Sequence, residues 1–250
     1  MAVFDVLNVT VSGCRMEANK ARATVPSTSL QQSASSNAIS GGGCVSVLFY
    51  GNASGSAVSV SGNTFEQCVV DVTLTDNVRV GNGYGGAVSV YFGLSAGLRQ
   101  LDVSFFNMVL HDNVFTGCEV NVSPILGGNA YGGGVSVYVG GYSSVFINQS
   151  GYAALAEVGE TVLHNASVTL KNSRFSSCIS RRRALTDAFG ASVYGGSFSF
   201  HVGAYAWSRS VSSLSPASST CGATSASGVS VNVSDAPCFN CSALTSTTGK

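Results

Sequence analysis

The stretch Gly85-Gly86-Ala87-Val88-Ser89-Val90 decides the fold, because close copies of it recur along the 250-residue chain. In a β-strand, successive side chains point to opposite faces. Val88 and Val90 therefore share one face, and Ser89 lies on the other. Each Gly-Gly pair is interpreted as a corner that needs a positive φ or close backbone approach. The other copies are Gly42-Gly43-Cys44-Val45-Ser46-Val47, Gly132-Gly133-Gly134-Val135-Ser136-Val137 and Gly195-Gly196-Ser197-Phe198-Ser199-Phe200.

A second motif alternates with the first and ends in cysteine. Asn63-Thr64-Phe65-Glu66-Gln67-Cys68 matches Asn113-Val114-Phe115-Thr116-Gly117-Cys118, and Asn172 to Cys178 follows with one inserted residue. The pattern predicts an interior stack of the rings of Phe65, Phe115 and Phe175. We expect Asn63, Asn113 and Asn172 at a corner, since Asn tolerates left-handed backbone.

The two motifs form a repeating unit, whose Gly-Gly pairs begin at positions 42, 85, 132 and 195. Parallel stacking of equivalent strands about 4.8 Å apart would place like side chains upon like. Parallel strands joined by long loops without helices favour a solenoid over an α/β sheet. We therefore predict an all-β fold, a right-handed parallel β-helix of about four to five coils with long irregular loops.

The repeat also predicts the organisation of the chain. We expect a single domain over 1–250, a fragment of a longer protein, with coils near 1–50, 51–93, 94–140 and 141–203 and an incomplete coil at 204–250. Residues 152–157 are interpreted as a single helical turn, and the Ser-rich stretch 208–227 as a loop.

Composition excludes some partners. Only 10% of the residues are charged, and 12 basic residues balance 12 acidic ones. Nucleic-acid binding depends on clustered Lys and Arg, so we expect no nucleic-acid partner. No apolar run approaches the roughly 18 residues of a membrane-spanning helix. The Gly81-Asn82-Gly83 turn precedes a strand instead of a helix, so it predicts no dinucleotide cofactor.

Two features favour an extracellular or cell-surface location. The chain has 8 cysteines and low charge, which suits an oxidising compartment. Its start lacks the basic and apolar regions of a signal peptide, so we expect the leader on a longer parent chain. Sequons for N-glycosylation are in mild excess over chance and begin at Asn8, Asn52, Asn121, Asn148, Asn165, Asn232 and Asn240.

The cysteines of the second motif have two readings. Cys68, Cys118 and Cys178 form either a ladder of buried thiols, which we prefer, or a column with a Cys68–Cys118 bridge. Cys238 and Cys241 form a C-x-x-C motif. We expect a disulfide among Cys221, Cys238 and Cys241 and no metal, because no second pair and no nearby His complete a zinc site.

Catalysis is not expected. The β-helix is also the fold of pectate lyases and polygalacturonases, but the motifs shared by those enzymes are missing. Glu119 aligns with Val69 and Ile179, and Asp112 aligns with Gly62 and Lys171, so no carboxylate column forms. Glycoside hydrolysis requires two converging carboxylates, and we expect no pair within about 10 Å on one exposed face. The remaining acids near these positions are Asp71 and Asp76.

Two further groups could contact ligands. Arg181-Arg182-Arg183 is interpreted as a solvated loop, with an anionic glycan or phosphate as the alternative. An aromatic stripe on one outer face would stack on sugar rings or simply cover the sheet, and its members are Tyr91, Tyr138, His201, Tyr205 and Trp207.

The alternating Gly-Gly-Ala-Val and Asn-x-Phe-x-x-Cys motifs resemble the repeats of the chlamydial polymorphic outer membrane proteins. The resemblance covers roughly residues 40–203, although cysteine stands where that family has asparagine. In this respect the chain looks more like the Cys-containing β-helix proteins of algal surfaces. The resemblance implies a non-enzymatic extracellular β-helix used for structure or adhesion, with surface or cell-wall glycans, or further coils of the parent chain, as partners. The alternative is a carbohydrate-binding or pectinase-like β-helix.

Overall fold

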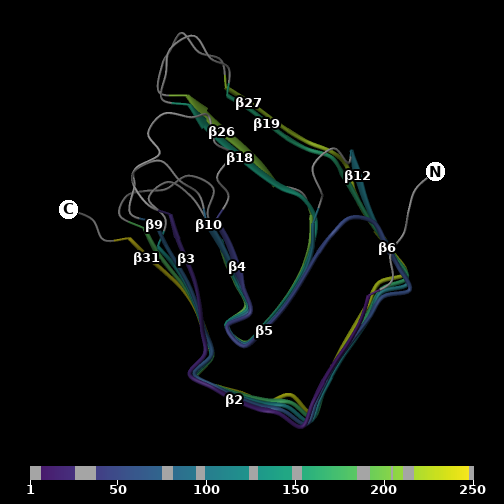
Figure 1. Cartoon of the computed structure of the whole chain (residues 1–250), viewed down its shortest axis with the longest axis vertical. Helices are drawn as coiled ribbons and strands as arrows, with labels where there is room; N and C mark the ends of the chain where they lie inside the picture. The colour runs from purple at the N-terminus through teal and green to yellow at the C-terminus, as the bar shows by residue number, and fades with distance from the viewer. Residues whose placement is uncertain are drawn as a thin grey trace.

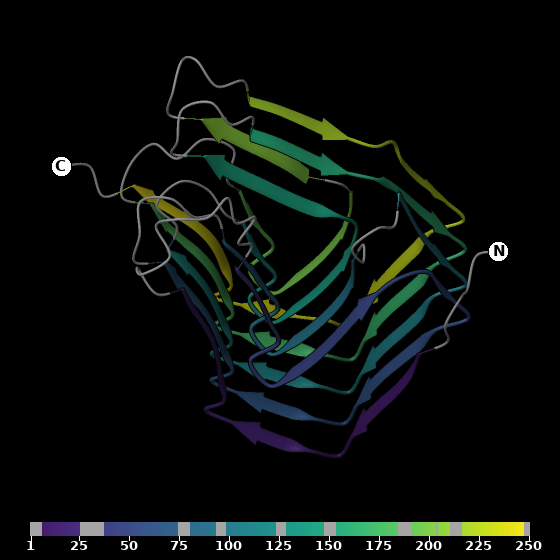
Figure 2. The same cartoon turned by 45° about the horizontal axis from the view of Figure 1, so that its top comes forward.

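The computed structural model describes residues 7–25, 38–74, 81–93, 99–123, 129–147, 154–184, 192–203, 205–210 and 217–247, and for some strand residues the backbone alone. In this part of the chain every regular element is a β-strand, and all paired strands run parallel. The strands form stacked sheets, the arrangement of a parallel β-solenoid (Figures 1 and 2). The predicted all-β fold of parallel strands is therefore confirmed.

Three sheets have five strands each, and each is named here by its first strand. The β1 sheet contains β1 (Asn8–Ser12), β7 (Ala57–Ser61), β13 (Asn107–His111), β21 (Ser167–Lys171) and β29 (Ser230–Ser234). The β2 sheet contains β2 (Arg15–Glu17), β8 (Thr64–Glu66), β14 (Val114–Thr116), β22 (Arg174–Ser176) and β30 (Cys238–Phe239). The β3 sheet contains β3 (Lys20–Val25), β9 (Val69–Leu74), β15 (Glu119–Ser123), β23 (Ile179–Ala184) and β31 (Ser242–Thr247).

Three further sheets have four strands, and two have two. The β4 sheet contains β4 (Ala38–Gly41), β10 (Gly81–Tyr84), β16 (Ala130–Tyr131) and β24 (Val193–Tyr194). The β5 sheet contains β5 (Val45–Tyr50), β11 (Val88–Gly93), β17 (Val135–Val139) and β25 (Phe198–Val202). The β6 sheet contains β6 (Ala53–Ser54), β12 (Gln100–Ser104), β20 (Glu160–His164) and β28 (Thr224–Ser227). The pairs are β18 (Tyr142–Ile147) with β26 (Tyr205–Ser210), and β19 (Ala154–Val158) with β27 (Ala217–Cys221).

The register follows the sequence repeat. Val88 pairs with Val45 in the preceding repeat and with Val135 in the following one. Phe115 pairs with Phe65 and Phe175 in the same way. Each repeat, meaning one pass of the chain through the sheets, therefore places its motif residues directly on those of its neighbours.

The Gly-Gly corner between the β4 and β5 sheets has a steric cause. Gly85 adopts φ 53°, and a Cβ there would collide with the carbonyl oxygen of Val88. A Cβ on Gly86 would collide with the carbonyl oxygen of Gly133 in the next repeat and lie 2.6 Å from the backbone nitrogen of Glu119. The first glycine thus supplies a left-handed backbone, and the second permits close approach of the backbones of neighbouring repeats.

This corner sends the β5 sheet through the inside of the cross-section (Figure 1). The main apolar core lies between the β1, β2, β5 and β6 sheets, and includes the strand residues Val58, Phe65, Val90, Leu101 and Met108. A smaller core lies between the β3 and β4 sheets, and consists of Val70, Val72, Val120, Val122 and Ala130. Two cores arise because the strands of the β4 sheet fold back along the inner face of the β3 sheet.

The asparagine corner differs from the prediction. Asn63 and Asn113 are buried, and Oδ1 of Asn113 accepts hydrogen bonds from the backbone N–H (3.1 Å) and the side-chain amide (3.0 Å) of Asn63. The left-handed residue is the one before, Gly62 in the second repeat and Asn172 in the fourth. Ser173 takes the place of the buried asparagine there, and its hydroxyl accepts from the Asn113 N–H at 3.3 Å. The expected left-handed geometry at Asn63 and Asn113 and the expected insertion are therefore wrong.

Three expected loops or turns contain strands. Residues 154–158 form β19 instead of a helical turn, and the Ser-rich stretch includes β27 and β28. The arginine run lies in β23, not in a loop. In each case pairing with an equivalent strand of a neighbouring repeat overrides weak local propensity.

Candidate functional site

Aromatic rings fill the wedge between the β4 and β5 sheets. Along the β4 sheet, the rings of Tyr84, Tyr131 and Tyr194 stack with centroids 4.8 Å apart at each step. Along the β5 sheet, Tyr91 and Tyr138 stack at 5.2 Å, and His201 follows Tyr138 at 5.1 Å. Rings of the two columns meet edge to face, a favourable geometry for aromatic pairs.

This wedge changes the interpretation of the aromatic stripe. Tyr91 and Tyr138 are only 2% and 1% exposed, so the expectation that they lie on an outer face is wrong. The physical reason is that the strands of the β4 sheet, with the tyrosines of β10, β16 and β24, cover this face of the β5 sheet. His201 is half-buried at the end of the same column. Tyr205 and Trp207 lie on β26, outside this column, and the structure describes only their backbone.

Burial holds these rings in their neutral forms. It raises the pKa of Tyr91 and of Tyr138 above that of an exposed tyrosine, and the Tyr138 hydroxyl donates a hydrogen bond to the carbonyl oxygen of Gly203 at 3.3 Å. Burial likewise lowers the pKa of His201, which favours its neutral imidazole. The aromatic columns therefore act as packing between two sheets.

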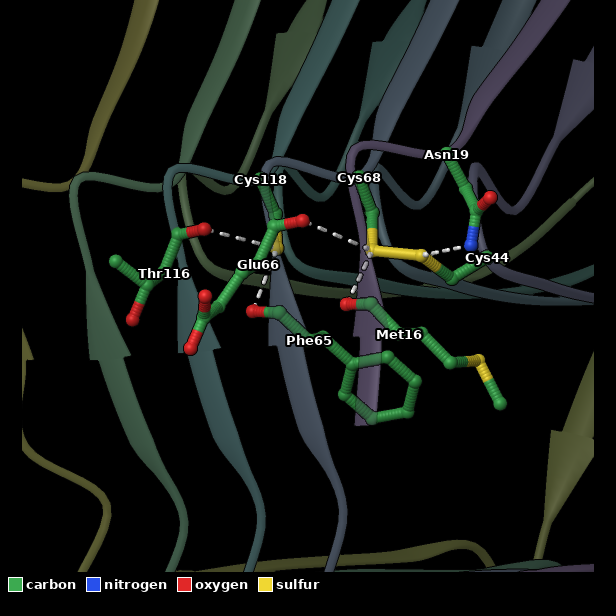
Figure 3. The surroundings of a disulfide bond; sticks show 8 residues. All are labelled: Met16, Asn19, Cys44, Phe65, Glu66, Cys68, Thr116 and Cys118. Atoms are coloured by element: carbon green, nitrogen blue, oxygen red, sulfur yellow. Dashed lines mark hydrogen bonds between the residues drawn. A yellow bond between two sulfur atoms is a disulfide. The ribbon is translucent and has the colours of Figure 1, made fainter. Parts of the chain in front are cut away.

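The cysteines form one interior disulfide and two buried thiols. Cys44, at the corner before β5, is bonded to Cys68, at the corner before β9, with Cα atoms 5.6 Å apart (Figure 3). The side-chain amide of Asn19 lies 3.6 Å from the Cys44 sulfur. Cys118 and Cys178 are buried free thiols. The thiol ladder is thus present for these two, whereas Cys68 is bridged to Cys44 and not to Cys118.

Sequence reasoning missed this disulfide because the two cysteines belong to different motifs. The sequence shows only that the residues equivalent to Cys44 in later repeats are small; the structure adds that backbone hydrogen bonds join them to Cys44 and to one another in repeat order. These residues are Ala87, Gly134 and Ser197.

A second disulfide joins Cys238 and Cys241, within the group expected to contain one, and Cys221 is an exposed free thiol. The described residues contain no group of three or more His, Cys, Asp or Glu side chains arranged to hold a metal ion.

Two carboxylates lie together on the outer face of the β3 sheet. Asp71 pairs in register with Asn121, two positions from Glu119, so the Cα atoms of the two acids are diagonal neighbours about 8 Å apart. Glu17 and Glu66 form a second pair, in register on the outer face of the β2 sheet, with their Oε2 atoms 3.6 and 3.1 Å from Arg15 Nη2. The expectation that no two carboxylates share an exposed face within about 10 Å is therefore wrong. Each acid of the β3 sheet also has a cationic partner: Lys20 Nζ lies 2.8 Å from Asp71 Oδ2, and Arg181 Nη1 lies 3.2 Å from Glu119 Oε1.

The environment of Asp71 favours its charged form. Burial raises its pKa, but hydrogen bonds from Lys20 and Thr73 and the charges of Lys20 and Arg22 outweigh burial and lower the pKa below its ordinary value. The general acid of a glycosidase needs the opposite shift. Asp71 and Glu119 therefore each form an ion pair with a basic residue on a neighbouring strand, Asp71 with Lys20 and Glu119 with Arg181.

The other candidate acids do not join this pair. Asp112 precedes the buried asparagine and pairs with His111, whose Nδ1 lies 2.7 Å from Asp112 Oδ2. The register aligns Asp112 with Gly62 and Asn172, and not with Lys171 as expected. Asp76 lies outside the described residues.

The arginine run is divided by strand alternation. Arg181 points outward to Glu119, whereas Arg182 points inward and is only 6% exposed. Val122 and Val72 occupy the position of Arg182 in the preceding repeats, and burial lowers its pKa. The run therefore does not present one cluster of three guanidinium groups to an anion.

The sequons differ in exposure. The asparagines of four are exposed: Asn8, Asn165, Asn232 and Asn240. Asn52 and Asn121 are half-buried, and Oδ1 of Asn52 accepts a hydrogen bond from the backbone N–H of Asp102 at 2.9 Å. Asn148 lies outside the described residues.

Comparison of the chain with protein-family models, curated proteins and solved structures finds no match. In the described part of the chain, there is no helix with the length and apolar character needed to span a membrane.

Proposed function

We propose that the chain is a right-handed parallel β-helix of the extracellular space or cell surface, with a structural and adhesive role and no catalytic activity. Support comes from the two motifs that resemble the chlamydial repeats, because their residues stack in register from repeat to repeat. The disulfide between Cys44 and Cys68 supports an oxidising compartment, since disulfides rarely persist in a reducing cytosol.

The outer face of the β1 sheet carries the adhesive part of the proposal. We call it the polar face. Every residue on it is at least partly exposed, and Lys171 is its one residue with a permanent charge. It consists of three columns: Asn8, Ala57, Asn107, Ser167 and Ser230; Thr10, Ser59, Val109, Thr169 and Asn232; and Ser12, Ser61, His111, Lys171 and Ser234.

Such a face suits a neutral, hydroxyl-rich polymer. Hydroxyl and amide side chains both donate and accept hydrogen bonds, as sugar hydroxyls do. Parallel strands repeat these groups about every 4.8 Å along the rod. A surface or cell-wall polysaccharide would therefore meet the same donors and acceptors at each repeat, and weak contacts would add along its length.

The test is binding of the purified chain to a glycan array and to insoluble neutral polysaccharides. A double variant, Ser59→Arg with Thr169→Arg, puts two bulky charges in the central column of the polar face. We expect it to lower polysaccharide binding at least about tenfold. The matched control is Thr116→Arg, on the exposed outer face of the β2 sheet.

Binding that survives the double variant, or that is lost equally in the control, contradicts the assignment of the polar face. A wild-type chain that binds no polysaccharide contradicts glycan adhesion itself.

A further inference from the structure

Four cysteines occupy one column through successive repeats. Sγ of Cys68, Cys118, Cys178 and Cys241 lies 3.8, 3.7, 3.7 and 3.6 Å from the carbonyl oxygen two residues earlier in its own repeat. The backbone continues the same ladder, because Glu119, Ile179 and Ser242 donate N–H bonds to the carbonyls of Cys68, Cys118 and Cys178. These four side chains therefore occupy the same place in four consecutive repeats.

The oxidation state changes along this sulfur column. Cys68 is bonded to Cys44 and Cys241 to Cys238, whereas Cys118 and Cys178 between them are free thiols. Each end of the free pair is thus one repeat away from a disulfide. Neighbouring Cα atoms in a parallel ladder are about 4.8 Å apart, inside the range of about 4.4–6.8 Å that a disulfide requires.

We propose that the sulfur column is a site of intramolecular thiol–disulfide exchange, in which Cys178 takes over the disulfide of Cys241. The Cys178 thiolate attacks Sγ of Cys241, the Cys178–Cys241 bond forms, the Cys241–Cys238 bond breaks, and Cys238 leaves as a thiolate that takes up a proton. The Cys178 proton goes to solvent beforehand. One disulfide and one thiol are present before and after, so the step needs no oxidant or reductant.

The surroundings favour Cys178 as the attacking group. The hydrogen bond from the Cys118 thiol lowers the pKa of Cys178, against the opposing effect of burial. The contact with Cys178, together with burial, raises the pKa of Cys118. Cys241 is half-buried and Cys238 is exposed, so the leaving thiolate is released into water.

The exchange would alter the repeat that contains β30 and β31. The Cys238–Cys241 bond closes a loop within one corner, whereas a Cys178–Cys241 bond ties the β30–β31 corner to the β22–β23 corner of the preceding repeat. The same step exposes a new thiol at Cys238. The exchange thus joins the repeat that contains β30 and β31 covalently to the preceding repeat, independently of any glycan binding.

The test uses the full chain, purified without reductant and incubated anaerobically at about pH 8, where thiolates are populated. Acid quenching, alkylation in denaturant and peptide mass spectrometry then map the bonds. We expect a peptide pair linked through Cys178 and Cys241 to appear with time, together with alkylated Cys238 in equal amount. The rate is expected to be independent of protein concentration over about a tenfold range, as for an intramolecular step.

Variants separate this exchange from general scrambling. Cys178→Ala is expected to abolish the new linkage, and Cys221→Ser, which removes an exposed thiol, to leave it unchanged. If Cys178→Ala does not fold, Cys238→Ser provides the second route: oxidised glutathione should then join Cys178 to Cys241, taking up the two electrons and two protons. The proposal fails if Cys178 remains alkylatable and Cys238–Cys241 intact at all times, or if Cys178 and Cys241 stay unlinked in the Cys238→Ser variant.

Discussion

Replacing Cys44 by alanine isolates the stabilisation by the interior disulfide. The next repeat already combines an alanine at this position, Ala87, with a free buried thiol, Cys118, so the substitution reproduces packing that the fold accepts. The bond joins residues separated by 24 positions. Restriction of the unfolded chain by a loop of that length stabilises the folded state by about 3.5 kcal/mol at room temperature.

The assay is chemical denaturation of wild type and Cys44→Ala, each with and without dithiothreitol. Without reductant, the free energy of unfolding of the variant should be lower by about 3.5 kcal/mol. With reductant, the two proteins should agree within about 0.5 kcal/mol, because only the cross-link distinguishes them. A difference that persists after reduction would show that packing at this corner, and not the covalent link, is responsible.

Three other outcomes follow from the columns. Ala87→Cys should form a disulfide with Cys118, seen as the loss of both thiols in mass spectra and a higher denaturation midpoint; two free thiols in the folded protein would contradict the equivalence of the corners. Phe115→Ala should cost about 3–5 kcal/mol of unfolding free energy, as for other buried aromatic side chains, whereas its exposed neighbour Val114→Ala should cost less than about 0.5 kcal/mol. Burial lowers the folded pKa of His201, so as pH falls below about 6.5 the unfolded chain takes up this proton first and stability decreases. His201→Tyr should reduce that loss between about pH 7.5 and 5, measured by denaturation midpoints, and an unchanged pH profile would count against it.

The repeat accounts for how much of the fold could be predicted. Alternation in Val88-Ser89-Val90 predicts a strand, and identical motifs predict parallel stacking, because equal side chains fill equal places in each repeat. Prediction from local propensity failed where pairing with a neighbouring strand determines the secondary structure, as in the arginine run, which was expected to be a loop and forms part of β23.

The candidate site was harder to predict, since it depends on where the chain folds back. Sequence alternation places Tyr91 opposite the core valines, which implies a surface position. Strand β10, which contains Tyr84, returns along the inside of the β3 sheet and covers that surface. Nothing within one strand reports which other strand covers it. The disulfide between Cys44 and Cys68 could not be predicted for the same reason, because their two corners adjoin only in the folded cross-section.

The alternation of apolar and polar residues in these strands also produces N-glycosylation sequons. A strand with polar residues outward and apolar residues inward contains polar–apolar–polar triplets, and where the polar residues are Asn, Ser and Thr such triplets spell Asn-x-Ser/Thr. In the described sequons the middle residue occupies a core-facing column; these residues are Val9, Ala53, Val122, Ala166, Val233 and Cys241. A solenoid whose outward residues are mostly uncharged and polar therefore accumulates sequons without selection for glycans. Its sequon count should be compared with the number that strand alternation alone produces. For this chain the interior disulfide is the stronger indicator of compartment.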